Sequence, residues 1–209
     1  MGYSTDFYGE VEVYPPLNEK EIEFLNKFSD TRRMDRKKGP YYVDGGGFCG
    51  QDREADIIDY NRPPSGQPWL WCQWVPNEDG TKIMWNGAEK FYSADEWMKY
   101  LVDHFIGKNP IAKNEDSKLS FLQSHVVHGV IEAQGEDRGD HWYLIVENNQ
   151  VRVENAVRKA PEISVLNKSP KPLVTKSISP SFLRNTLIIC LLSSLSKTKE
   201  VLDSFIREL

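Results

Sequence analysis

An aromatic stretch between Gln67 and Gly87 constrains the fold of this chain more than any other feature. Its sequence, QPWLWCQWVPNEDGTKIMWNG, holds four of the chain's six tryptophans. The apolar runs on either side of PNEDG predict a β-hairpin, with strands over 69–75 and 81–85 joined by a loop over 76–80. Four tryptophan side chains in one hairpin expose a large apolar surface, and we expect the rest of the fold to pack against it.

The first strand of this hairpin has large aromatic side chains on both faces. Successive side chains along a strand point to opposite faces, so Trp69 and Trp71 would lie opposite Trp74. Both faces are then apolar, which predicts a central strand covered on both sides. Core packing is one explanation. The alternative is an exposed ledge of Trp69 and Trp71, on which a base or a partner side chain stacks, with Gln73 as a polar contact.

The rest of the chain up to residue 159 shows strand and helix patterns. Alternation and turn signals predict four more strands, over 7–14, 121–133, 141–147 and 150–156. Two helices are expected, one beginning after an N-cap at Asn18 and one after a capping box formed by Ser93 and Glu96. The fold class that follows is α+β, an antiparallel sheet of about five to six strands with two helices on one face.

A change in composition divides the chain into three parts. The α+β body covers 1–159, a linker or strap with four prolines covers 160–180, and amphipathic helices cover 181–209. This C-terminal helical appendage either packs on its own body or forms a homo-oligomer. Its longest apolar run, Leu187–Leu192, has six residues, whereas a bilayer span needs roughly 20, so we expect no membrane partner.

Charge is unevenly distributed along the chain. Residues 160–209 carry seven basic and four acidic residues (+3), which leaves 19 basic and 27 acidic residues (−8) in 1–159. An acidic body argues against bulk DNA binding, which depends on phosphate contacts, and is compatible with a basic protein target. No early apolar run resembles a secretion signal, and three scattered cysteines form no disulfide framework, so we expect a cytoplasmic protein.

A basic cluster followed by tyrosines is a candidate binding site. Five of the seven residues from Arg32 to Lys38 are cationic, and Tyr41 and Tyr42 follow shortly after. Arginines can clamp phosphate while tyrosines stack on a base, although cations just after a helix also suit its dipole. The glycine-rich loop that ends at Gln51 lacks the ending of a phosphate-binding P-loop, so we interpret it as a flexible loop or a lid.

Acidic and histidine side chains offer a catalytic alternative. Glu136 and Asp137 lie in a polar turn and could bind a divalent cation or act as acid and base, with His104 or His128 as a partner. His125 and His128 are three residues apart, so on a strand they face opposite sides and do not share a metal. The chain also lacks a CxxC pair, and we expect neither a metal site nor a cofactor.

Seven strings between residues 2 and 155 are distinctive: GYSTDFYG from Gly2, TRRM from Thr31, GPYY from Gly39, QPWLWCQW from Gln67, EKFY from Glu89, EWMKYLVDHF from Glu96 and IEAQGED from Ile131. They resemble a family of proteins without an assigned activity that tailed bacteriophages and scattered bacteria carry. Residues 160–209 depart from its pattern. The resemblance implies no catalytic residue. It implies a setting among phage or mobile-element accessory genes, where inhibitors, immunity proteins and small-molecule sinks are common.

The expected function is therefore that of a non-enzymatic binding protein of the counter-defence or immunity type. Stacking and cationic groups without a reaction-specific motif favour a cleft for a nucleotide-like ligand or a basic protein target. The expected contact residues are Arg32, Arg33, Tyr41, Tyr42, Gln51, Trp71 and Gln73. Two alternatives stay open: a metal-dependent enzyme acting on a nucleotide or nucleic acid, and a structural subunit that oligomerises through 181–209.

Overall fold

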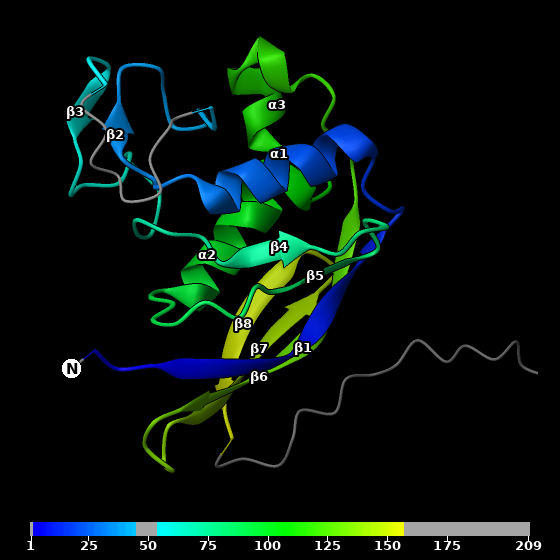
Figure 1. Ribbon diagram of the computed structural model, residues 1–209. Helices are drawn as coiled ribbons and strands as arrows, with labels where there is room; N and C mark the ends of the chain where they lie inside the picture. Colours follow the sequence, from blue (N-terminus) through cyan, green and yellow to red (C-terminus); the bar gives the residue numbers. More distant parts are fainter. Residues whose placement is uncertain (1, 45–53, 157–209) are drawn as a thin grey trace, which may run out of the picture. The chain divides into compact units, whose positions relative to one another are not determined.

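The fold is built on a six-stranded antiparallel sheet with strand order β4-β5-β1-β6-β7-β8 (Figure 1). The computed structural model of the protein describes residues 2–44 and 54–156. The strands are β1 (Thr5–Tyr14), β4 (Trp74–Pro76), β5 (Lys82–Trp85), β6 (Val126–Gly135), β7 (His141–Glu147) and β8 (Gln150–Asn155). The predicted α+β class with an antiparallel sheet is confirmed.

Short helical elements and a second, two-stranded sheet complete the described part. The helical elements are α1 (Glu19–Asp30), α2 (Ala94–Leu101), the π-helical turn η1 (Val102–Ile106), α3 (Ile111–Glu115) and the 3-10 turn η2 (Ser117–Leu119). The small sheet pairs β2 (Asp35–Arg36) with β3 (Ile57–Asp59). The predicted segments 160–180 and 181–209 lie outside the described residues, and so does Gln51.

The central strand β1 shows why one face of the sheet belongs to the core. Phe7, Val11 and Val13 are buried, whereas Tyr8 and Tyr14 are exposed on the opposite face. These buried side chains form one core cluster with aromatic side chains of the helices, in which Phe28 of α1 meets Phe105 of η1 with ring centroids 5.0 Å apart, edge to face. Such a pair stabilises by about 0.5–1.5 kcal/mol beyond its area burial. The helices therefore pack on the sheet through this apolar face.

Helix α1 begins as the sequence predicts. Asn18 accepts hydrogen bonds from the backbone N–H groups of Lys20 and Glu21, at 3.0 and 3.1 Å. The Glu21 carboxylate accepts the Asn18 backbone N–H in return, at 2.8 Å, which completes a capping box. Glu21 is fully buried, and its carboxylate lies 3.1 Å from Nε2 of the buried His125. The helix start is thus tied to the segment before β6.

The predicted tryptophan hairpin is only partly correct. Strand β4 covers Trp74–Pro76 instead of 69–75, and it is an edge strand instead of a central one. Ahead of β4, the Leu70 carbonyl accepts the backbone N–H of Arg33 at 2.9 Å, so this part of the segment pairs outside the six-stranded sheet. The tryptophans also differ in burial: Trp74 is 1% exposed, whereas Trp69 is 45% exposed. Alternation in the sequence could not reveal that the 31–44 segment competes for this backbone.

Helix α2 forms where the sequence predicts a helix, but without the predicted capping box. Ser93 has a left-handed backbone (φ 54°, ψ 43°) and its side chain makes no cap hydrogen bond. An N-cap normally has an extended backbone, which places its oxygen over the first N–H groups, and the left-handed conformation turns it away. The expected apolar face is correct, since Trp97, Leu101 and Phe105 are all buried.

The C-terminal strands of the sheet follow the sequence closely, with one difference. β7 and β8 are joined by Asn148 and Asn149, both with positive φ (51° and 68°), as the predicted two-residue turn requires. β6 begins at Val126 instead of residue 121, because Leu119 and Leu122 are buried in the core before the strand starts. No helix among the described residues is long and apolar enough to cross a membrane.

Candidate functional site

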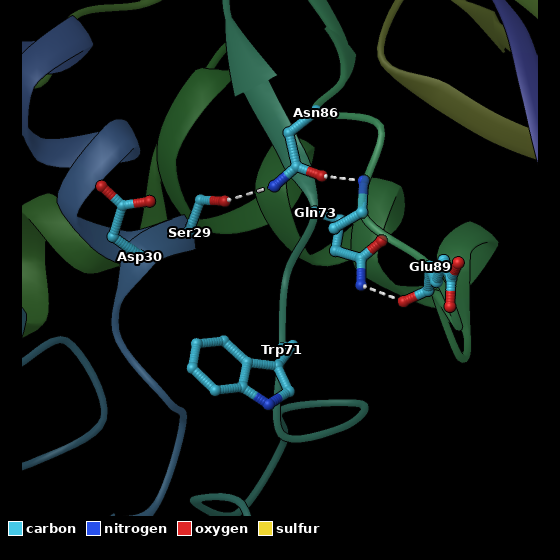
Figure 2. Close-up of a pocket in the computed structure, with 7 residues that line it drawn as sticks. Ser29, Asp30, Trp71, Gln73, Asn86 and Glu89 are labelled. Carbon is cyan, nitrogen blue, oxygen red and sulfur yellow. Dashed lines mark hydrogen bonds between the residues drawn. The ribbon is translucent and has the colours of Figure 1, made fainter. Parts of the chain in front are cut away.

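A cavity of about 680 Å³ lies where the C-terminal end of α1 meets the segment before β4. The described residues that line it are Ser29, Asp30, Trp71, Gln73, Asn86, Ala88 and Glu89 (Figure 2). The volume lies in the range of ligand sites, whereas the lining is more polar than usual, with Trp71 as the one aromatic side chain among the described lining residues. Two predicted contact residues, Trp71 and Gln73, therefore meet in one cavity.

The Gln73 amide is fixed by hydrogen bonds from two directions. Its Nε2 donates to the backbone carbonyl of Glu89 at 3.1 Å, and its Oε1 accepts Nε1–H of Trp85 at 3.1 Å. The Gln73 side chain is largely buried. Because both ends of the amide have partners, Gln73 holds the 86–89 segment in place, and the Glu89 carboxylate is brought to the cavity wall.

Asn86 connects this wall to helix α1. Its Nδ2 donates to Oγ of Ser29 at 3.5 Å, and its Oδ1 accepts the backbone N–H of Ala88 at 2.9 Å. Ser29 in turn donates to the backbone carbonyl of Cys72 at 2.8 Å. These contacts join three segments that lie far apart in the sequence, so the cavity is built by tertiary structure.

The electrostatic character of the cavity is negative. Asp30 and Glu89 are exposed carboxylates that line it, and its described lining residues include no lysine or arginine. Asp30 is the last residue of α1, and the carbonyl end of a helix carries a partial negative charge. Figure 2 shows the two carboxylates on either side of the Trp71 indole and the Gln73 amide. The arrangement suits a cationic group that stacks on the indole.

Arg33, a predicted contact, lies in the interior. Its guanidinium donates to the backbone carbonyls of Pro40 and Tyr42 at 2.9 and 2.8 Å, and its Cζ lies 4.1 Å from the Phe28 ring centroid. Burial lowers the pKa of Arg33 to about 10. Arg33 is only 2% exposed, so it holds the 40–42 segment in place and presents no guanidinium to a ligand.

The other predicted contacts are also separate from the cavity lining. Arg32 donates to the carbonyl of Tyr60 at 3.2 Å. Tyr41 is buried, and its hydroxyl lies 2.9 Å from Nδ1 of His104. Tyr42 accepts a hydrogen bond from Lys38 Nζ at 3.0 Å, and the same ammonium lies 4.3 Å from the tyrosine ring centroid. The structure thus separates the basic cluster from Trp71 and Gln73.

The residues of the catalytic alternative do not come together. Glu136 accepts the backbone N–H of Ser4 at 2.8 Å, in the turn after β6. His128 lies on β6, eight positions before Glu136, so the two are separated by roughly 26 Å at 3.3 Å per residue. His104 contacts Tyr41 and Tyr100 instead. Within residues 2–44 and 54–156, no group of three or more His, Cys, Asp or Glu side chains is placed to hold a metal ion.

The lining residues that were not predicted as contacts are Ser29, Asp30, Asn86, Ala88 and Glu89. They belong to the end of a helix and to a turn about 60 positions later. Glu89 begins the EKFY string, but neither segment contains a motif that indicates ligand binding. The comparisons with known proteins add no further residue, because no family model, no curated protein and no solved structure matches this chain. The resemblance to phage-borne proteins stays a prediction.

Proposed function

We propose that this chain is a non-enzymatic binding protein whose Trp71 cavity receives a cationic side chain of a basic protein target. The observation that carries the proposal is one aromatic surface between two carboxylates, Asp30 and Glu89, in a cavity of about 680 Å³. The counter-defence or immunity setting is part of the proposal and rests on the sequence resemblance alone. An acidic chain, with a formal net charge of −5, supports the choice of a basic target.

The physical basis is a cation–π contact reinforced by charge. An arginine or lysine over an indole face gains roughly 0.5–2 kcal/mol, and more burial gives the larger value. Trp71 is half-buried, so part of its ring is accessible to a partner. The carboxylates and the carbonyl end of α1 add attraction for the same charge. A guanidinium fits best, because it is planar and can both stack and donate to carboxylates.

The lining favours this target over a nucleotide-like ligand. A phosphate in the cavity would face Asp30 and Glu89 with no described cation beside it. The cations expected to clamp phosphate have other partners: Arg33 is buried, and Arg32 bonds to the Tyr60 carbonyl. A base could still stack on Trp71, but its phosphate would weaken binding by repulsion.

The test is a titration followed by NMR of the indole N–H signals. The probe is the peptide Gly-Arg-Gly-Arg-Gly, and its control has citrulline, a neutral isostere, in place of arginine. We expect the arginine peptide to shift the Trp71 signal and to bind at least about tenfold tighter than the control, a difference of about 1.4 kcal/mol. Adenosine monophosphate is the third ligand. Tighter binding of the nucleotide than of the arginine peptide would overturn the proposal in favour of the nucleotide alternative.

Variants place the interaction in this cavity. Asp30→Asn and Glu89→Gln should each weaken binding of the arginine peptide about three- to tenfold. Trp71→Ala should weaken it at least as much, measured by the affinity because the variant lacks the Trp71 signal. Glu78→Gln removes the same charge from the exposed β4–β5 loop, away from the cavity lining, and should leave the affinity unchanged. An equal loss in Glu78→Gln would mean that only the overall negative charge of the protein attracts the peptide.

A further inference from the structure

A second cavity, of about 460 Å³, lies beside α2 and η1 and has no part in the proposed function. Its described lining residues are Gly66, Gln67, Pro68, Glu96, Lys99, Tyr100, Asp103 and His104. The rings of Tyr100 and His104 stack, with centroids 4.0 Å apart and planes 17° apart. Two polar aromatic side chains therefore form one continuous wall of the cavity.

The hydrogen-bond partners of His104 determine which ring nitrogen carries the proton. Nδ1 lies 2.9 Å from the Tyr41 hydroxyl oxygen, and that hydroxyl also contacts the Glu115 carboxylate. A carboxylate only accepts, so the single Tyr41 proton goes to Glu115. Nδ1 of His104 must then be the donor to Tyr41, and in the neutral ring Nε2 is an acceptor.

The neutral form of His104 is favoured by its surroundings. Burial lowers the pKa of His104, while the nearby Glu115 and Asp103 oppose this effect and Lys99 adds to it. Burial also raises the pKa of Tyr41, with the Glu115 contact as the second cause, so the Tyr41 hydroxyl stays protonated and can serve as a donor. Nε2 makes no hydrogen bond with any residue that the structure describes, and it is available to a ligand.

Tyr100 provides the complementary donor. Its hydroxyl oxygen accepts a hydrogen bond from Nε2 of Gln67 at 3.1 Å, and that amide nitrogen also donates to the Pro40 carbonyl at 2.7 Å. Gln67 Oε1 is already bonded to Nε of Arg33 at 3.3 Å. The Tyr100 hydroxyl proton has no acceptor within the described ranges. The hydroxyl is therefore a donor with a fixed oxygen position.

The charged residues of this cavity largely compensate each other. Lys99 Nζ lies 2.5 Å from the Asp103 carboxylate, one helical turn away, so neither charge calls for a charged ligand. Glu96 is exposed at the surface of α2. A neutral ligand that needs one donor and one acceptor from the protein fits this lining better than a phosphate.

We propose that the Tyr100–His104 cavity is a second binding site, specific for a neutral ligand with an N–H next to a carbonyl, the edge of an amide or a nucleobase. His104 Nε2 accepts the ligand N–H, and the Tyr100 hydroxyl donates to the ligand carbonyl. Tyr41 and Glu115 are positioning residues, because they act on the ligand only through the tautomer of His104. The site is independent of the Trp71 cavity.

The test uses long-range ¹⁵N–¹H spectra of the histidine rings, with the His104 signals assigned from His104→Gln. The free protein at pH 7.5 should show His104 as a neutral ring with its proton on Nδ1. Uridine, which has an N–H between two carbonyls, should shift the Nε2 signal. N3-methyluridine lacks that N–H and should bind about three- to tenfold more weakly, the effect of one hydrogen bond. Propanamide, as a simple amide, distinguishes a general amide site from a nucleobase site.

The variants separate the donor from the positioning residues. Tyr100→Phe should weaken uridine about three- to tenfold without changing the His104 tautomer. Glu115→Gln, at an exposed position where folding is not at risk, should yield a mixture of tautomers and weaker binding. Acidification should also weaken binding, because protonated Nε2 becomes a donor. A proton on Nε2 in the free protein, no response to uridine or propanamide, or equal affinity for uridine and N3-methyluridine would each overturn the proposal.

Discussion

Arg33 and its neighbour Arg32 show how two identical side chains take different roles. Arg32 bonds to Tyr60 and Asn61 at the surface, whereas Arg33 lies over Phe28 and bonds to the carbonyls of Pro40 and Tyr42. A buried guanidinium needs such partners, since an unpaired buried charge costs several kcal/mol. Arg33 therefore stabilises the fold, and its charge is not available for phosphate.

The pair allows a matched prediction on stability. Arg33→Ala should lower the free energy of unfolding by about 2–4 kcal/mol, because it leaves two buried carbonyls unpaired and opens a cavity over Phe28. Arg32→Ala, at a half-exposed site, should change it by less than about 0.5 kcal/mol. Urea unfolding followed by tryptophan fluorescence measures both. Equal effects would show that the burial of Arg33 is not what distinguishes the two residues.

At the scale of elements, the two main helices begin in different ways. α1 has a complete capping box, with Asn18 accepting two backbone N–H groups and also donating from Nδ2 to the Phe121 carbonyl at 3.2 Å. α2 begins after Ser93, whose left-handed backbone leaves its side chain without a cap bond. The first helix is set by local hydrogen bonds. The second depends on tertiary contacts of Trp97 and Phe105, which are fully buried.

These two starts predict different responses to the same substitution. Asn18→Ala should destabilise the protein by about 1–2 kcal/mol, since it removes the cap and the contact with Phe121. Ser93→Ala should have an effect below about 0.5 kcal/mol, because the hydroxyl makes no cap bond. Thermal unfolding measured by circular dichroism gives both values. A cost for Ser93→Ala as large as that for Asn18→Ala would mean that Ser93 also caps its helix in solution.

At the scale of the whole molecule, one buried ion pair makes stability depend on pH. Nδ1 of His125 lies 2.7 Å from the Pro15 carbonyl and Nε2 lies 3.1 Å from Glu21, so both nitrogens face acceptors and the ring is held as an imidazolium. Burial works to lower the pKa of His125, but the bonds to Glu21 and Pro15 outweigh it and the pKa is raised. For Glu21, burial is outweighed by the bonds from His125, Asn18 and Gln123, and the pKa is lowered.

The two shifts define a pH window. The Glu21 contribution is present above its unfolded pKa, near 4.5, and is lost as the pH falls through the lowered folded value. The His125 contribution is present below about 6.5 and is lost as the pH rises through the raised folded value. The pair should therefore stabilise most between pH 4.5 and 6.5. Urea unfolding of His125→Gln should show a free energy of unfolding lower by about 3 kcal/mol. That free energy should also fall less steeply as the pH rises above about 6.5 than it does in the wild type.

A matched variant tests whether the loss of stability at alkaline pH comes from this pair. His128→Gln changes a half-buried histidine on β6 that makes no hydrogen bond among the described residues. Its unfolding free energy should follow the wild-type pH profile. Two results would assign the pH dependence to another group. One is a free energy of unfolding that no longer falls at alkaline pH in His128→Gln, and the other is a wild-type fall in His125→Gln.

The sequence by itself determined the features that depend on neighbours along the chain. The alternation in β1, the Asn18 cap and the Asn148–Asn149 turn all follow from local backbone preferences, and each is correct. These features were enough to predict an α+β fold with an antiparallel sheet. They act within a few residues, so no knowledge of distant segments is needed to recognise them.

Only the tertiary structure decided which tryptophan is buried in the core and which residues line the same cavity. Alternation placed Trp74 in a central strand, but β4 lies at the edge of the sheet, and ahead of it the Leu70 carbonyl accepts the backbone N–H of Arg33. Trp71 and Gln73, predicted as ligand contacts, line one cavity, whereas Asp30 and Glu89 join them only after folding. Sequence separation carries no information on such contacts, because the packing of helices on the sheet sets the distance between the segments.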